Sequence, residues 1–356
     1  MVCTAFLLML CVTGLVLIWV DEIDATFAGH PAPPSRPAVV ELANLDAIFA
    51  RALERAPGER VTYADWAFDG VLVGVNMALA DSEERTRQLV FDAHTGAFME
   101  DTKTDNPNHP VRVFLRIMNR LHITMFAGLP GSFLLAGMTV LFVAATVSGA
   151  VLYGPFRRGL EFGAVRNGHE RRRLLDLHNL LGIVTLGWVF VVSVSGIMNA
   201  FTVPLYSAWR QSVVRELAGE PMAKLDTSES IGPQAALEAA YRVDRDSRMV
   251  RLVPPGGWQG APGYYLVWVQ GSTPVQSKIF RPILVHAQTG RVNLSHRPPW
   301  YLKALQMSRP LHFGDYGGSP LKMLWSAFAF IAIYILVSGW RLWWRRVRVK
   351  EKAQPA

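Results

Sequence analysis

Two histidines stand at equivalent points of a sequence that repeats itself. Leu121-His122 is followed by a glycine, a proline and a Ser-Gly pair, and the same residue types recur 190 positions later. The matching residues are Gly128, Pro130, Ser148 and Gly149 in the first copy and Leu311, His312, Gly318, Pro320, Ser338 and Gly339 in the second. Each histidine borders an apolar run, and ligating side chains at membrane depth usually have a function. A two-fold axis along the membrane normal would make the imidazoles of His122 and His312 face each other.

A facing pair of imidazoles is the arrangement that binds a haem iron from both sides. The chain has no Cys-x-x-Cys-His motif for covalent attachment, so the expected cofactor is haem b. A lone histidine in this position would more often hydrogen-bond a helix end, but the repetition favours ligation of iron by His122 and His312. Asp315 could orient His312 by accepting its second ring N–H, or it could cap its own loop. Close approach to a flat macrocycle would be allowed by Gly128, Gly131, Gly317 and Gly318.

His178 stands at the other edge of an apolar run, and the repeat predicts that it binds a second haem on that side. Thr13-Gly14 corresponds to Ser195-Gly196, 182 residues later, so the counterpart of His178 would fall a few residues upstream of Met1. We expect a short basic segment with a fourth histidine there. Without that histidine the protein would hold one haem, or it would use His169 as a substitute ligand. The other histidines match no compact zinc motif and are expected to be structural or exposed: His30, His94, His109, His286 and His296.

Composition and charge indicate a membrane protein with large polar segments. The 356 residues are 51% hydrophobic with a mean hydropathy of +0.20, too apolar for an ordinary soluble domain. Runs long enough to span a bilayer lie at about 3–20, 129–153, 179–203 and 321–344. The net charge of +8 arises largely from arginines between the second and third runs and after the fourth. Basic short loops stay in the cytoplasm, so both termini are predicted inside a bacterial inner membrane and both polar segments in the periplasm. The uneven charge argues against binding to nucleic acid.

The first apolar run has two interpretations. It could be a cleaved signal peptide, with Ala28-Gly29 as a loose cleavage context, but the repeat favours a retained transmembrane helix. Cys3 and Cys11 both lie in this run, so disulfides are not expected in the polar segments.

Each polar segment has the pattern of a small α+β domain. The first is predicted to contain a helix at 41–56, strands at 60–68, 70–80 and 87–92, and a Thr95-Gly96 turn before another strand. The second is predicted to contain a helix near 233–243, strands at 248–253, 263–270 and 277–286, and a turn at Thr289-Gly290.

The predicted fold class is an α-helical membrane protein with four transmembrane helices in two pseudo-symmetric halves and two small α+β periplasmic domains. The predicted segments are a first transmembrane helix at 1–20, a periplasmic domain at 21–120, a second helix at 121–155, a basic cytoplasmic loop at 156–177, a third helix at 178–203, a second periplasmic domain at 204–315, a fourth helix at 316–344 and a basic tail at 345–356.

These motifs together resemble the PepSY-associated transmembrane family, which includes iron-regulated inner-membrane proteins and ferric-siderophore reductases. The resemblance covers nearly the whole chain, and its most specific part is Leu311-His312-Phe313-Gly314-Asp315-Tyr316-Gly317-Gly318. The other matching pieces are Thr13-Gly14 followed by Asp21-Glu22-Ile23-Asp24, the two Thr-Gly turns, Leu177-His178-Asn179 and Ser338-Gly339-Trp340. The resemblance implies four helices, two periplasmic PepSY-type domains and b-haems held by the boundary histidines. The family pattern also has a histidine ahead of the first helix, which this sequence lacks.

The leading functional hypothesis is a transmembrane electron conduit. Electrons from a cytoplasmic or quinol donor would pass through haem and reduce a periplasmic ferric siderophore, because reduction lowers the affinity of iron for hard oxygen ligands. One alternative is a non-catalytic anchor whose PepSY-type domains bind or inhibit a periplasmic protease, and another is a sensor or accessory subunit of iron import. The sequence has no nucleotide, flavin or nicotinamide motif. Aromatic residues that could line a chelate site, or simply pack in a sheet, are Trp66, Trp258, Tyr264, Tyr265, Trp268 and Trp300.

Overall fold

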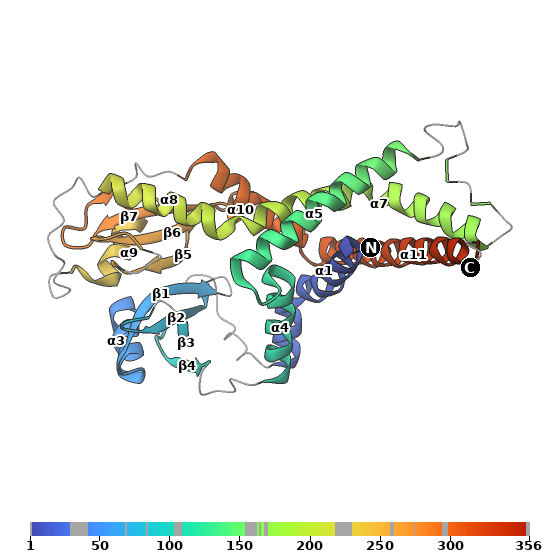
Figure 1. Cartoon of the computed structure of the whole chain (residues 1–356). Helices are drawn as coiled ribbons and strands as arrows, with labels where there is room; N and C mark the ends of the chain where they lie inside the picture. Colours follow the sequence, from blue (N-terminus) through green and yellow to red (C-terminus); the bar gives the residue numbers. More distant parts are fainter. Residues whose placement is uncertain are drawn as a thin grey trace. The chain divides into compact units, whose positions relative to one another are not determined.

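The protein consists of two compact units, each made of segments that are distant in sequence (Figure 1). The computed structural model describes residues 2–28, 42–67, 70–82, 85–102, 109–153, 162–163, 165–166, 170–217, 230–256, 260–273, 275–293 and 298–353. The helical unit comprises Met1–Ala28, Pro110–Thr202 and Met307–Ala356. The sheet unit comprises Gly29–His109 and Val203–Gln306.

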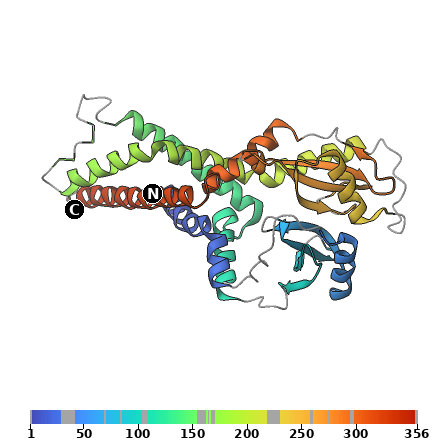
Figure 2. The same ribbon diagram turned by 180° about the vertical axis from the view of Figure 1, so that it is seen from behind.

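The helical unit contains the candidate membrane spans. In the described part of the chain, three helices are long and apolar enough to cross a bilayer, and a bent pair brings the number to four. The three are α5 (Gly128–Val151), α7 (Glu170–Ala200) and the first part, Gly318–Arg345, of α11 (Gly318–Ala353). The bent pair is α1 (Val2–Ile18) and α2 (Val20–Phe27), with an angle of 56° between them. α7 and α11 lie side by side (Figures 1 and 2), consistent with the predicted multi-pass protein.

The break after the first helix recurs in the second half of the chain. At the end of α1 the N–H of Trp19 donates to the carbonyl of Val16 at 3.2 Å. At the end of α7, 182 residues later, the N–H of Phe201 donates to the carbonyl of Met198 at 3.0 Å, and α8 (Thr202–Leu217) follows. Both helices therefore end in a tightened turn with a hydrogen bond between residues three apart, at equivalent positions of the repeat. The repeat is visible in the backbone as well as in the sequence.

Two shorter helices precede two of the spans and carry two of the three candidate ligands. α4 (Pro110–Thr124) contains His122, and α10 (Trp300–Phe313) contains His312. The chain leaves α4 through two residues with positive φ, Met125 at 50° and Phe126 at 61°. His122 therefore lies in a helix of its own rather than at the start of a single helix over 121–155. The turn brings α5 so close that a Cβ at Gly131 would clash with the carbonyl oxygen of Thr124.

The two polar segments form one eight-stranded antiparallel sheet rather than two separate sheets. Its strand order is β4-β3-β2-β1-β5-β6-β7-β8, and the halves join where β1 pairs with β5. The strands are β1 (Glu59–Ala67), β2 (Leu72–Leu79), β3 (Arg85–Asp92), β4 (Phe98–Asp101), β5 (Arg248–Val253), β6 (Tyr264–Gln270), β7 (Phe280–His286) and β8 (Val292–Asn293). The predicted strands all occur, although the one expected from residue 277 starts later because Gln276–Lys278 form a 3-10 turn.

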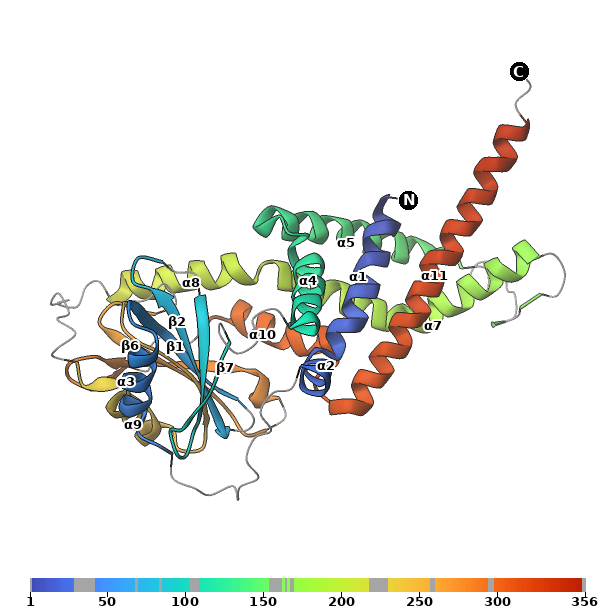
Figure 3. The same ribbon diagram turned by 90° about the horizontal axis from the view of Figure 1, so that it is seen from below.

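Helices α3 (Leu45–Arg55) and α9 (Gly232–Val243) pack side by side against this sheet (Figure 3). Their N-termini cap each other: the N–H of Leu45 donates to Gln234 Oε1 at 2.9 Å, and the N–H of Gln234 donates to Asp46 Oδ1 at 2.9 Å. This exchange satisfies backbone donors that a helix start leaves without intrahelical partners. Each α+β segment thus completes the other.

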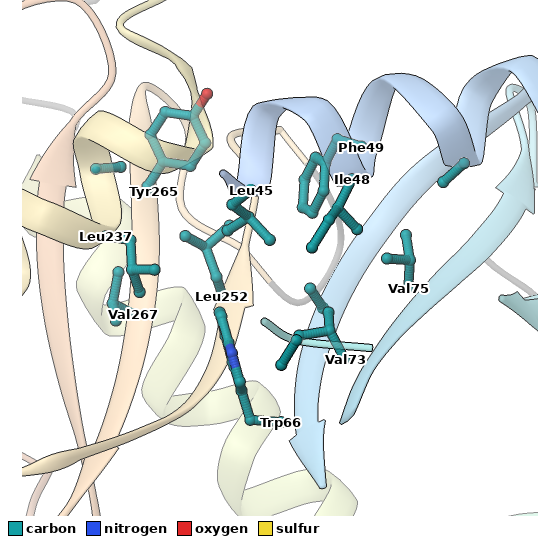
Figure 4. Packing of buried hydrophobic residues seen from close by; sticks show 14 of the residues in the cluster. Leu45, Ile48, Phe49, Trp66, Val73, Val75, Leu237, Leu252, Tyr265 and Val267 are labelled. Atoms are coloured by element: carbon teal, nitrogen blue, oxygen red, sulfur yellow. The ribbon is translucent and has the colours of Figure 1, made fainter. Parts of the chain in front are cut away.

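The core under the two helices is also shared. Leu252 of β5 is fully buried and pairs across the junction with Ala64 of β1. Figure 4 shows Leu252 with Leu237 and Val267 on one side and with Ile48 of α3 on the other. One hydrophobic core therefore serves both halves of the sheet unit.

Candidate functional site: a histidine pair in the helical unit

His122 and His312, 190 residues apart in sequence, face each other in the helical unit. Their ring centroids are 6.1 Å apart and the ring planes make an angle of 61°. The expectation that the repeat brings these two imidazoles together is met.

The ring of His122 rests on α1. Its Nδ1 lies 2.8 Å from Thr13 Oγ1. The neighbouring Gly14 allows the ring to come close, since a Cβ there would stand 3.1 Å from His122 Cε1. The two contacts lie at neighbouring atoms of the ring, Nδ1 and Cε1, so α1 fixes this edge of the imidazole.

The ring of His312 rests on α7 in the same manner. Its Nδ1 lies 2.9 Å from the carbonyl oxygen of Val192 and 3.3 Å from Ser195 Oγ. A Cβ at Gly196 would stand 3.0 Å from His312 Cε1. These groups orient the His312 ring; the expected part of Asp315 in orienting it stays a prediction. Asp315 lies in the turn after α10, where its N–H donates to the carbonyl of Pro310.

His178 has an equivalent seat within the helical unit. It lies in α7 and its Nδ1 is 2.9 Å from Ser338 Oγ of α11. A Cβ at Gly339 would stand 3.3 Å from His178 Cε1. The fourth pair, Ser148-Gly149 on α5, has no described residue within 4 Å of the Cβ position of Gly149.

The spacing of His122 and His312 fits two axial ligands of one metal. With metal–nitrogen bonds of about 2 Å on opposite sides, two imidazole centroids stand roughly 6 Å apart. Both Nδ1 atoms are engaged with neighbouring helices, so Nε2 is the nitrogen each ring can offer. The two histidines lie in α4 and α10, outside the candidate spans. Burial lowers the pKa of both imidazoles, and the nearby His312 lowers the pKa of His122 further. The lowered pKa favours the neutral form of both rings, which is the form that binds a metal.

The glycines predicted to admit a macrocycle have local backbone roles. Gly128 and Gly318 begin α5 and α11 with positive φ of 61° and 59°, and nothing described lies within 4 Å of their Cβ positions. A Cβ at Gly317 would stand 2.9 Å from Leu321 Cβ. Their approach to a bound ring stays a prediction.

The remaining described histidines lie outside this site. His286 Nδ1 faces the N–H groups of Gln288 and Thr289 at 3.3 Å and so closes its turn, as Asp92 does in the first half. His94 lies in the turn closed by Asp92, and His109 precedes α4. His30, His169 and His296 fall outside the described residues. No group of three or more His, Cys, Asp or Glu side chains able to hold a metal occurs in the described ranges. A bis-imidazole site needs only two.

Ion pairs at both ends of the helices fix the frame around the histidines. Glu22 and Asp24, part of the motif after Thr13-Gly14, pair with Lys322 at 2.8 Å and with Arg112 at 3.3 Å. These contacts fasten α2 to α11 and α4. At the basic end Arg345 of α11 pairs with Glu170 of α7 at 2.8 Å. The sequence motif Asp21-Glu22-Ile23-Asp24 thus has a structural use that its residue types alone did not reveal.

The candidate aromatic residues of the sheet unit are mainly packing residues. Trp66, Tyr264 and Tyr265 are buried, and Trp268 packs against Trp209 with ring centroids 5.5 Å apart. Trp300 is exposed, and Trp258 falls outside the described residues. Most of the six aromatic residues therefore pack in or against the sheet, rather than being free to line a chelate site.

In a comparison with protein families the chain matches the family described as "PepSY-associated TM region" over residues 1–346. No curated protein matches the chain.

Proposed function

The chain belongs to the PepSY-associated transmembrane family, and from this premise we propose that it is a haem-b-binding electron conduit that reduces ferric chelates across a bacterial inner membrane. The observation that carries the proposal is the pair of imidazoles, His122 and His312, whose centroids stand 6.1 Å apart. Family membership supports a membrane protein with PepSY-type domains. The geometry of the histidines supports the cofactor.

The residues present fit a bis-imidazole b-haem. Each ring is held through Nδ1 by another helix, which leaves Nε2 as the nitrogen that can bind a metal. Bound haem would supply reversible one-electron transfer between its ferric and ferrous states. Thr13 and Ser195 would keep the two rings in place while the charge at the iron changes, so little reorganisation would be needed at each transfer.

A second haem would extend the route towards the basic end. His178 lies in α7 five residues after Arg173, and the basic residues of 171–173 and 341–350 mark the predicted cytoplasmic side. Electrons from a cytoplasmic or quinol donor would enter near His178 and leave near His122 and His312. A ferric siderophore on the periplasmic side would accept one electron per iron and release the weaker-bound ferrous ion.

The orientation gives a test of its own. A fluorescent reporter fused after Ala356 is expected to fluoresce, and alkaline phosphatase fused at the same point is expected to be inactive, because the basic C-terminal segment is held in the cytoplasm. The matched control is the same pair of reporters inserted between Leu217 and Ser230, where the opposite pattern is expected. Phosphatase activity after Ala356 would contradict the orientation.

The function is tested in sealed proteoliposomes that contain a trapped reductant, dithionite. A ferric trihydroxamate and a ferrous-iron indicator are added outside. The wild-type protein is expected to form the ferrous complex well above the rate seen in vesicles with the His122→Ala/His312→Ala double variant. Equal rates in the two preparations would contradict an electron conduit through this histidine pair.

A further inference from the structure

Three Ser/Thr-Gly pairs, Thr13-Gly14, Ser195-Gly196 and Ser338-Gly339, each receive one histidine ring from another helix. We infer that these pairs are imidazole cradles: the hydroxyl, together with a carbonyl of the same helix, sets the tautomer of the ring, and the glycine sets its distance. The hydroxyl and glycine residues are thereby positioning residues for the candidate ligands. The inference on the tautomer stands by itself, and its consequence for haem rests on the proposed function.

The tautomer follows from counting protons. A hydroxyl has one hydrogen to donate and can accept two hydrogen bonds. Thr13 Oγ1 donates to the carbonyl of Met9 at 2.7 Å, which commits its only hydrogen. Its contact with His122 Nδ1 at 2.8 Å must then be an acceptance, so Nδ1 carries the ring proton. Nε2 of His122 is left with a lone pair, which is the form that binds a metal.

The other two cradles show the same arrangement. Ser195 Oγ donates to the carbonyl of Val191 at 2.6 Å, and the carbonyl of Val192, which can only accept, lies 2.9 Å from His312 Nδ1. Ser338 Oγ donates to the carbonyl of Ile335 at 2.9 Å. In each case the proton is placed on Nδ1. Each hydroxyl donates its hydrogen to a carbonyl of its own helix, as Ser and Thr commonly do in helices, and can then only accept a hydrogen bond from the ring.

The glycines set how close the rings can lie. Cβ atoms at Gly14 and Gly196 would stand 3.1 and 3.0 Å from the Cε1 atoms of His122 and His312, which is too tight for undisturbed contact. Relief would need a ring displacement of a few tenths of an ångström. A binding site functions only when its ligating side chains lie within about 0.5 Å of their productive positions. The displacement caused by Gly14→Ala or Gly196→Ala would therefore be a large part of the allowed distance of about 0.5 Å, even though alanine has the higher helix propensity.

Ser148-Gly149 provides a matched control within the same chain. Its hydroxyl donates to the carbonyl of Ala144 at 2.8 Å, as in the cradles, but no described atom other than those of the adjoining turns of its own helix lies within 4 Å of a Cβ at Gly149. Gly149→Ala therefore makes the same chemical change, in a span of the same kind, without an imidazole against it.

The tautomer is tested first on protein without haem. Protein with 15N-labelled histidine, purified without haem in detergent, is expected to show protonated Nδ1 and unprotonated Nε2 for His122 and His312 in the NMR spectrum, with signals assigned by His→Gln variants. Thr13→Val removes one acceptor of the ring proton and is expected to lower the population of the Nδ1-protonated form at His122, although the carbonyl of Leu10 still accepts from the ring; Thr13→Ser is expected to restore the wild-type population. A protonated Nε2 in the wild-type protein would overturn the inference, whether or not the protein binds haem.

The positioning role is tested on protein with haem. Gly14→Ala and Gly196→Ala are each expected to lower haem affinity by about 10-fold or more and to convert low-spin to high-spin spectra, the size typical of lost outer-shell support. Gly149→Ala is expected to retain the wild-type affinity and spectrum. Unchanged spectra in both cradle variants, or an equal change in Gly149→Ala, would overturn the positioning role. A wild-type protein that never binds haem would instead overturn the proposed function.

Discussion

Replacing both His122 and His312 with alanine is expected to remove one b-type haem from the protein. In the proposed site these two rings would hold the haem iron, and no group of three or more His, Cys, Asp or Glu side chains able to hold a metal occurs in the described residues. Each single variant is expected to convert a six-coordinate low-spin haem to a high-spin or empty site. Haem content and reduced-minus-oxidised spectra in detergent measure both effects.

The control for this experiment is His94→Ala, in a turn of the sheet unit that Asp92 closes through its side chain. It is expected to leave the spectrum unchanged. The apolar runs of the spans are untouched in all variants, so membrane insertion should be retained. A double variant with the wild-type spectrum would exclude the assignment of these two ligands.

The largest effect on stability is expected at Leu252, where the two halves of the sheet unit share their core. Leu252 is fully buried between α3 and the strands of both halves, so Leu252→Ala removes apolar contact and leaves a cavity. Such changes cost about 2–5 kcal/mol. The expected result is a clear fall in the midpoint of thermal unfolding of the full chain in detergent.

Leu79→Ala is the matched control, since Leu79 is 52% exposed at the end of β2 in the same sheet. It is expected to shift the midpoint only slightly. Equal shifts for the two leucine variants would mean that the β1–β5 junction does not carry a common core.

The membrane spans, the helices α3 and α9 and most of the strands could be predicted because their patterns are local, whereas α8 and α10 were not predicted. Apolar runs marked the spans, and Thr-Gly turns with short β-rich segments located the strands within a few residues. The pairing of His122 with His312 was also foreseeable, because equal offsets in a duplicated membrane unit bring matching residues towards each other. The repeat carried this information without any need for contact data.

Other features depend on contacts that no local pattern encodes. β1 and β5 pair through strand edges, and the sequence of a strand does not show whether its edge pairs with another strand or faces solvent. The end of α4 depends on positive φ at Met125 and Phe126, residues that rarely adopt this conformation. The Ser/Thr-Gly pairs are recognisable in the sequence as markers of the repeat. Their hydrogen bonds to histidines join helices that are distant in sequence, so only the structure shows them.

The most direct measurement is the visible spectrum of the wild-type protein, purified in detergent from haem-replete cells, before and after addition of dithionite. The expected result is a low-spin b-type difference spectrum, with at least one haem per chain, that depends on His122 and His312. A well-folded preparation without haem would contradict this account and would favour a membrane anchor that binds a periplasmic protease.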